Sequence, residues 1–121
     1  MKKLIALAFI ATLIISGCAK DTRYEPLAKC LTEKGVVMYG GFACPHCLEQ
    51  KRDFGSGIDF IKYVECDSRH KDYDEEACKA ANIQAFPTWT FPGQEPIEGR
   101  VALEVLAKKA LCEDTLPTED Q

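Results

Sequence analysis

Two cysteines separated by two residues lie where an apolar segment gives way to a helix-forming one. Cys44-Pro45-His46-Cys47 follows the apolar run 36–39 and two glycines, and it precedes residues 48–52, which favour a helix. We therefore place the pair where a strand ends and a helix begins. A helix start presents unpaired N–H groups and a partial positive charge, and both stabilise a thiolate. We expect Cys44 at the N-cap with an exposed sulfur, and Cys47 one turn later and more buried.

The residues around the pair separate the possible uses of this motif. Haem attachment needs histidine directly after the second cysteine, where Leu48 stands. Zinc needs a second pair of ligands, and Cys66 and Cys78 are too far apart to form a second such knuckle, so we expect no metal. A small structural disulfide remains an alternative. The motif favours reversible dithiol–disulfide chemistry, in which the second cysteine resolves a mixed disulfide formed at the first.

The first residues have the pattern of an export signal. A basic start, Met1 to Lys3, precedes residues 4–15, which are apolar apart from one threonine and too short for a comfortable membrane span. Ile15-Ser16-Gly17-Cys18 resembles the lipobox of bacterial lipoproteins, in which the cysteine is acylated and begins the mature chain. We expect a lipoprotein signal peptide over 1–17 and lipidation of Cys18. An ordinary signal peptide and an uncleaved anchor are the alternatives.

Cleavage there would leave a lipidated tether over 18–23, one domain over 24–112 and an acidic tail over 113–121. Loss of Lys2 and Lys3 changes the formal net charge from −4 to −6. This charge argues against nucleic acid and against charge-driven binding of anionic lipid. We therefore expect the lipid to hold the protein in the cell envelope, on the periplasmic face. Ala19 in place of aspartate favours the outer membrane if the cell is Gram-negative.

Seven cysteines are many for a chain of 121 residues. With Cys18 set aside, an even number remains, as expected in an oxidising compartment. A domain of this size has a modest core, which disulfides would help to stabilise. The six remaining cysteines are Cys30, Cys44, Cys47, Cys66, Cys78 and Cys112.

Hydrophobic patterning and turn residues predict eight elements in the rest of the chain. Their order is helix, strand, CxxC helix, strand, helix, strand, strand, helix, which predicts an α/β fold with a mixed sheet covered on both faces. The expected helices span 24–34, 45–54, 72–81 and 101–111, and the expected strands span 36–42, 60–66, 88–91 and 96–98. In the last helix we place four residues at helical spacing on the apolar face, namely Val101, Val105, Leu106 and Leu111, and we expect the acidic tail after it to be loose.

This order resembles the thioredoxin superfamily, in which the CxxC motif begins a helix and a second motif precedes a later strand. Phe86-Pro87-Thr88 matches that second motif. The resemblance implies a single-domain thioredoxin-like fold with a cis peptide bond before Pro87, and with Phe86 and Pro87 lining the substrate cleft opposite the CxxC pair. A trans turn proline is the alternative. A cis bond before proline costs only about 0.5–1 kcal/mol, so a fold can impose it.

A closer resemblance covers residues 36–111. Glu65-Cys66, the segment 77–83, Phe86-Pro87-Thr88-Trp89 and Gly99 resemble the thioredoxin-like domain associated with bacterial and plant homologues of vitamin K epoxide reductase. The resemblance implies a structural disulfide between Cys66 and Cys78. Cys30 and Cys112 are then left over on the first and last helices, and we pair them, with two free buried thiols as the alternative.

Two departures from thioredoxin concern proton transfer. Met38 stands where thioredoxin has a buried aspartate, and Gly40 stands where it has tryptophan. Glu65 is the nearest substitute acid that the sequence offers. Pro45-His46 matches oxidases of the DsbA type, so we expect these two residues to tune the pair, with His46 helping to stabilise the Cys44 thiolate.

Together these features imply an exported protein thiol–disulfide oxidoreductase, acting through Cys44 and Cys47 in the oxidase or isomerase direction. The resemblance implies no cofactor. It implies cysteine-containing proteins as substrates and a membrane redox partner similar to vitamin K epoxide reductase or DsbB. The alternatives are a periplasmic thiol reductase, for example of the type used in cytochrome c maturation, and a redox-inert binding module with a thioredoxin fold.

Overall fold

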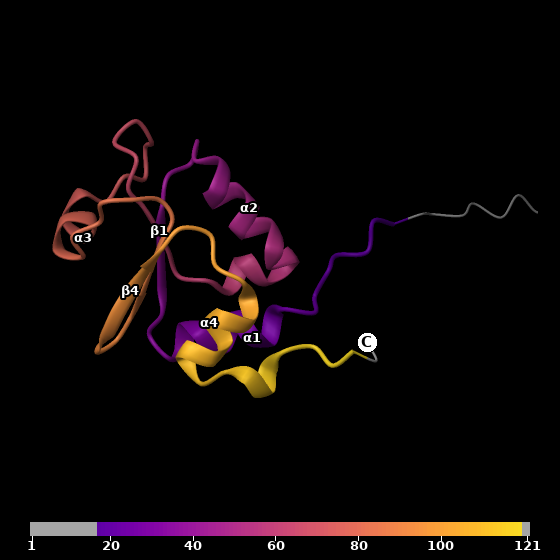
Figure 1. Ribbon diagram of the computed structural model, residues 1–121. Coiled ribbons are helices and arrows are strands. Elements are labelled where there is room, and N and C mark those ends of the chain that lie inside the picture. The colour runs from indigo at the N-terminus through magenta and orange to yellow at the C-terminus, as the bar shows by residue number, and fades with distance from the viewer. Residues whose placement is uncertain (1–16, 120–121) are drawn as a thin grey trace, which may run out of the picture.

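The computed structural model describes residues 17–119, so most of the expected signal peptide lies outside it. Helices flank a four-stranded sheet, and Figure 1 shows α3 on the opposite side of β1 from α2 and α4. No helix in the described part of the chain is long and apolar enough to cross a membrane. The elements are α1 (Glu25–Glu33), β1 (Val37–Gly40), α2 (Pro45–Asp53), η1 (Gly55–Phe60), β2 (Tyr63–Glu65), α3 (Glu75–Ala80), β3 (Thr88–Phe91), β4 (Gln94–Glu98), α4 (Leu103–Ala110) and η2 (Glu113–Thr115), where η marks a 3-10 helix.

The sheet has the strand order β2-β1-β3-β4. β2 runs parallel to β1, whereas β3 runs antiparallel to both β1 and β4. The eight predicted elements occur in the predicted order, with two 3-10 helices added. The chain therefore has a thioredoxin-like α/β fold, and the predicted fold class is confirmed.

The hydrophobic core lies mainly on one face of the sheet. Met38 and Trp89 are register partners on β1 and β3, and both are fully buried. They belong to one cluster with Leu31 of α1, Phe54 after α2 and Leu106 of α4. Alternate residues of β1 on the other face are only half-buried, because the short α3 covers less of that face. Helices therefore cover both faces of the sheet, as expected, but they cover the face on the α3 side less completely.

A buried glutamine fixes the position of the helix that carries the CxxC motif. The Gln50 side chain donates to the Val101 carbonyl (3.0 Å) and accepts from the Val101 N–H (2.7 Å) and the Trp89 indole N–H (3.0 Å). Each buried polar atom in this group thus has a partner, and an unpaired one would cost about 1–3 kcal/mol. Gln50 thereby joins α2 to β3 and to the segment before α4.

The second strand is shorter than predicted. We expected it from residue 60, but residues 55–60 form η1 and β2 begins at Tyr63. Thr32 of α1 explains the difference, because its hydroxyl donates to the Phe60 carbonyl and accepts from the Lys62 N–H. The Phe60 carbonyl and the Lys62 N–H therefore bond to α1, and the first bond to β1 is the one that the Lys62 carbonyl accepts from the Met38 N–H, at 3.0 Å.

The C-terminal elements correct two further expectations. In α4 the buried stripe comprises Leu103, Leu106, Ala107 and Ala110, whereas Val105 and Leu111, which we had placed on the apolar face, are exposed. The acidic tail does not begin as loose chain. Its first residues form η2, and Leu116 packs against the core.

The tether predicted over 18–23 is attached to the domain from Asp21 onward. The Asp21 carbonyl accepts hydrogen bonds from the backbone N–H and the hydroxyl of Ser56, both at 2.9 Å. Gly55 has a φ of +55°, and a Cβ there would lie 2.5 Å from the Asp21 oxygen, so this close approach needs glycine. Cys18, three residues earlier, is exposed.

Two disulfide bonds cross-link the domain. Cys30 of α1 is bonded to Cys112 just after α4, so the bond joins the first and last helices. Cys66, directly after β2, is bonded to Cys78 of α3. Both pairings are those expected, and they leave Cys44 and Cys47 as the free thiols of the domain core described here.

Candidate active site

Cys44 occupies the N-cap of α2. Its backbone is extended, and its sulfur accepts a hydrogen bond from the Cys47 backbone N–H at 3.2 Å. Pro45 follows in the first helical turn, where its missing N–H leaves no bond unmade. The partly exposed Cys44 sulfur therefore lies at the positive end of the helix dipole, beside the N–H groups of the first helical turn.

Cys47 lies one turn further along and has no exposed surface. Burial, and then its hydrogen bond with Cys44, raise the pKa of the Cys47 thiol to about 12. The two thiols therefore differ in environment as predicted from their spacing. Substrate can reach Cys44, whereas Cys47 can react only with a sulfur already attached at Cys44.

The Phe86–Pro87 loop faces the cysteine pair, and its peptide bond is cis. The Cys44 thiol lies 3.7 Å from the Phe86 carbonyl oxygen, to which it can donate a weak hydrogen bond. A Cβ on Gly41 would lie 3.1 Å from the Phe86 ring, so glycine allows the ring to approach the backbone just after β1 closely. The geometry places Phe86 within reach of any group bonded to the Cys44 sulfur.

Three apolar side chains next to the cysteine pair, in the sequence or in space, are partly exposed. Phe42, Leu48 and Phe86 are each exposed to about two-fifths. A hollow of about 240 Å³ adjoins Phe86 on the side of α3, and its wall includes Tyr73, Lys79, Ile83 and the Cys66–Cys78 pair. Phe86 therefore borders both the Cys44 sulfur, through its carbonyl, and this hollow.

His46 does not bond to the Cys44 sulfur among the contacts of the described residues. Its Nδ1 lies 3.5 Å from a Glu49 carboxylate oxygen, and its side chain is 70% exposed. An exposed pair of this kind interacts weakly. The tuning role expected for Pro45 and His46 stays a prediction.

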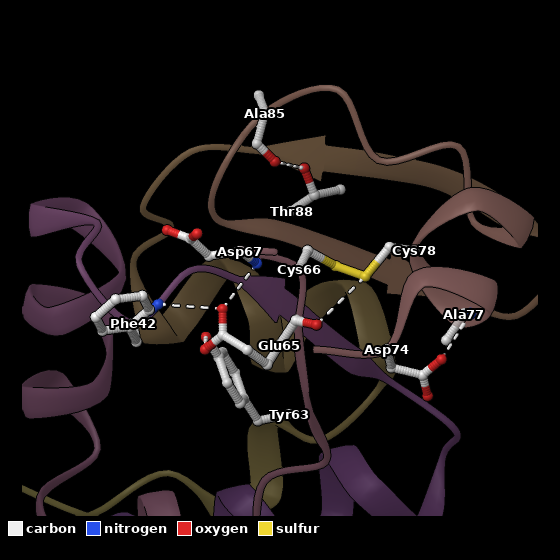
Figure 2. The surroundings of a disulfide bond; sticks show 10 residues. All are labelled: Phe42, Tyr63, Glu65, Cys66, Asp67, Asp74, Ala77, Cys78, Ala85 and Thr88. Atoms are coloured by element: carbon white, nitrogen blue, oxygen red, sulfur yellow. Dashed lines mark hydrogen bonds between the residues drawn. A yellow bond between two sulfur atoms is a disulfide. The ribbon is translucent and has the colours of Figure 1, made fainter. Parts of the chain in front are cut away.

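Glu65 is a buried carboxylate beside the Cys66–Cys78 disulfide (Figure 2). Its Oε1 accepts from the backbone N–H groups of Phe42 (3.2 Å) and Asp67 (2.9 Å), and its Oε2 accepts from the Tyr63 hydroxyl (3.0 Å). Its carbonyl oxygen lies 3.5 Å from the Cys78 sulfur. Three donors therefore hold this carboxylate in one orientation near the active-site loop.

Tyr63 is a site residue that the sequence interpretation missed. A Cβ on Gly40 would lie 2.9 Å from the Cys47 sulfur and 3.3 Å from the Tyr63 hydroxyl oxygen, so both groups border the space left by that glycine. Alternation along a strand places Tyr63 and Glu65 on one face, which was readable from the sequence. The parallel pairing of β1 with β2, which brings that face to Cys47, could not be read from the sequence.

The donor groups of the site do not form a metal centre. Between residues 17 and 119, no cluster of three or more His, Cys, Asp or Glu side chains is arranged to hold a metal ion.

Comparison with known proteins agrees with this cysteine chemistry. No protein-family model matches the chain. The chain is similar to the thiol-disulfide oxidoreductase LTO1 of Arabidopsis thaliana, with 42% identity over 86 residues, which is 68% of this chain and 23% of the plant protein. The chain thus spans about a quarter of the length of that relative. This similarity and the cysteine geometry support a role in thiol–disulfide exchange.

Proposed function

We propose that the chain is an exported protein thiol–disulfide oxidoreductase that exchanges disulfides with cysteine-containing proteins through Cys44 and Cys47. One observation carries the proposal. The Cys44 sulfur lies partly exposed at the start of α2 and close to the Phe86 carbonyl, while Cys47 lies buried one turn behind it. This arrangement supplies an attacking thiol, a resolving thiol and a backbone edge for substrate.

The exchange has two steps and needs only the two cysteines. In the oxidase direction, a substrate thiolate attacks the Cys44 sulfur of the Cys44–Cys47 disulfide, and Cys47 leaves with the electron pair. A second substrate thiolate then attacks the substrate sulfur bonded to Cys44, which releases Cys44 and the oxidised substrate. The substrate loses two electrons and the pair gains them. The Phe86 backbone would hold the segment around the substrate cysteine by strand-type hydrogen bonds.

We propose the oxidase or isomerase direction from the Pro45-His46 dipeptide and the position of Cys44 on the helix. Stabilisation of the Cys44 thiolate makes the dithiol form more stable and the disulfide a stronger oxidant. Electrons taken from substrate would then pass to a membrane partner similar to vitamin K epoxide reductase or DsbB. Thiol trapping in the producing cells tests the direction, since an oxidase keeps the pair mostly as a disulfide and a reductase keeps it mostly as dithiol.

Cys47→Ser is expected to trap the enzyme on its substrates. Without the resolving thiol, a mixed disulfide between Cys44 and a substrate protein persists, and adducts that disappear with reductant should accumulate on non-reducing gels. The matched control is the double variant Cys44→Ser/Cys47→Ser, which should form none. Equal adducts in both variants, or none in either, would contradict the proposal and favour a redox-inert binding module.

We also propose that a lipid on Cys18 anchors the domain to the membrane, on the periplasmic face of the envelope. Cys18 is exposed and lies three residues before the point where the chain docks on η1. Cys18→Ser is therefore expected to move the protein from the membrane fraction to the soluble fraction while insulin-reducing activity is kept. Recovery of this variant with the membranes, in the same share as the parent, would count against the anchor.

A further inference from the structure

We propose that Tyr63 and Glu65 carry the proton of the Cys47 thiol to and from solvent during disulfide exchange, a role that rests on the proposed function of the Cys44–Cys47 pair. Both residues lie on β2, and no part of the CxxC motif contains them. They would do the work of an acid placed on β1, where this chain has the buried and apolar Met38.

Cys47 needs such a path because its thiol is cut off from water. It has no exposed surface, and burial holds its pKa far above neutral. As attacking group, Cys47 must lose its proton before it can displace a substrate from Cys44. As leaving group in the opposite direction, its thiolate must gain a proton so that it does not attack Cys44 again.

The first part of the path is the space over Gly40. The Cys47 sulfur and the Tyr63 hydroxyl both border the point where a side chain would begin on that residue. Burial, and then the bond to Glu65, raise the pKa of the Tyr63 hydroxyl, so it stays neutral. A neutral hydroxyl can accept a proton from one neighbour while it donates its own to another. Tyr63 can therefore pass a proton without becoming a phenolate.

The second part is the hydrogen bond from Tyr63 to Glu65 (Figure 2). The Tyr63 hydroxyl donates to Oε2 at 3.0 Å, while two backbone N–H groups occupy Oε1. The carboxylate thus keeps one oxygen directed at the tyrosine. Lys51 of α2 lies over the Tyr63 ring, with its Nζ 3.6 Å from the ring centre, and its charge favours the Cys47 thiolate.

The last part is an opening to water. A cavity of about 320 Å³ lies against Tyr63 and Glu65. A water molecule occupies about 30 Å³ in the liquid, so the cavity has room for several. Its other walls are Phe42, Lys51, His70 and Asp72. The titratable and charged groups around the path are Cys44 and Lys51 from α2, Tyr63 and Glu65 from β2, and Asp67, Arg69, His70 and Asp72 from the loop after β2.

When a substrate disulfide oxidises the Cys44–Cys47 pair, the pair loses two electrons and the substrate gains them. The Cys44 thiolate attacks one substrate sulfur, and the other leaves as a thiolate. Cys47 gives its proton through Tyr63 to Glu65, and its thiolate attacks the Cys44 sulfur. The substrate sulfur that was bonded to Cys44 leaves with the electron pair of that bond. Glu65 then releases the proton to water in the cavity. In the oxidase direction the same transfers run in reverse.

Rapid mixing of the reduced protein with dithiobisnitrobenzoate separates the two sulfur attacks. Cys44 releases the first coloured thiolate and Cys47 releases the second, so only the second release needs the path. Cys18→Ser is the background, because any protein without the proposed lipid would present an exposed thiol at Cys18 that also reacts. Tyr63→Phe removes only the hydroxyl, and Glu65→Gln removes only the charge. The matched controls are Tyr39→Phe on β1 and Glu98→Gln on β4.

The expected result is an unchanged first release and a slower second release in Tyr63→Phe and Glu65→Gln. At pH 7 the slowing should be about a hundredfold, the lower end of the range for a positioned acid–base group. The difference should shrink toward pH 10, because the ionised fraction of Cys47 rises with pH toward its raised pKa of about 12 and fewer attacks then depend on the transfer. Both controls should match the parent. A circular dichroism spectrum equal to that of the parent shows that each variant is folded.

Three other outcomes would overturn the inference. An unchanged second release in both variants would exclude the path, and equal slowing at every pH would assign these residues a structural role. If His70→Asn rather than Glu65→Gln abolished the pH dependence of the second release, the group that passes the proton to water would be that histidine. Absence of the first release in the parent protein is a different result, because it would refute the proposed function itself.

Discussion

Replacement of Cys44 by serine is expected to lower catalysed insulin reduction and dithiol oxidation to the uncatalysed rate. A serine hydroxyl at the start of α2 is not ionised near neutral pH, so the group that attacks a disulfide is lost. Removal of the nucleophile lowers kcat by about 2 × 10⁶ in a serine protease where it has been measured. The measurement is the turnover of insulin with dithiothreitol, and of a dithiol peptide with glutathione disulfide.

The matched control for this prediction is Cys18→Ser, which changes the other exposed free thiol of the described chain. It should keep the activity of the parent. Activity retained in Cys44→Ser would show that another cysteine carries the chemistry, and the assignment of the site would be wrong.

Loss of the disulfide between Cys30 and Cys112 is expected to destabilise the fold more than any other single bond. The two residues are 82 positions apart. In the chain-entropy description a loop of this size contributes about 4.5 kcal/mol, whereas the 12-residue separation of Cys66 and Cys78 contributes about 3 kcal/mol. The whole free energy of unfolding of a native domain is only about 5–15 kcal/mol. The first of these bonds therefore supplies a large part of the free energy of unfolding of this domain.

Urea unfolding of Cys30→Ala/Cys112→Ala, compared with the parent and with Cys66→Ala/Cys78→Ala, tests this prediction. The free energy of unfolding should fall most in the first double variant. A fall of less than about 1 kcal/mol there, or a larger fall in the second, would contradict the account of how the first and last helices are held.

The sequence was most informative where local chemistry decides the structure. The strand 88–91 has the predicted bounds, and Cys44 caps its helix because the residues around it favour a strand before and a helix after. The prediction failed where distant side chains intervene. Thr32 takes the backbone bonds around residue 60, and the face of α4 is set by what it packs on, which leaves Val105 exposed.

The candidate site divides in the same way. Cys44 and Cys47 follow from their spacing, and the pairing of Cys66 with Cys78 follows from a family resemblance. Tyr63 and Gln50 could not be found in this manner, because their roles depend on contacts between segments far apart in the chain. Gly40 shows the limit most clearly. Its sequence position suggested only a flexible residue, whereas the structure uses the missing side chain to bring Cys47 and Tyr63 to one space.

A redox titration of the purified protein tests the central claim most directly. The protein is equilibrated with glutathione buffers, its thiols are alkylated, and the modified cysteines are identified by mass. We predict a two-electron transition confined to Cys44 and Cys47, with a midpoint less negative than the value of about −270 mV known for thioredoxin. A pair that remains wholly dithiol or wholly disulfide across every buffer would contradict the account.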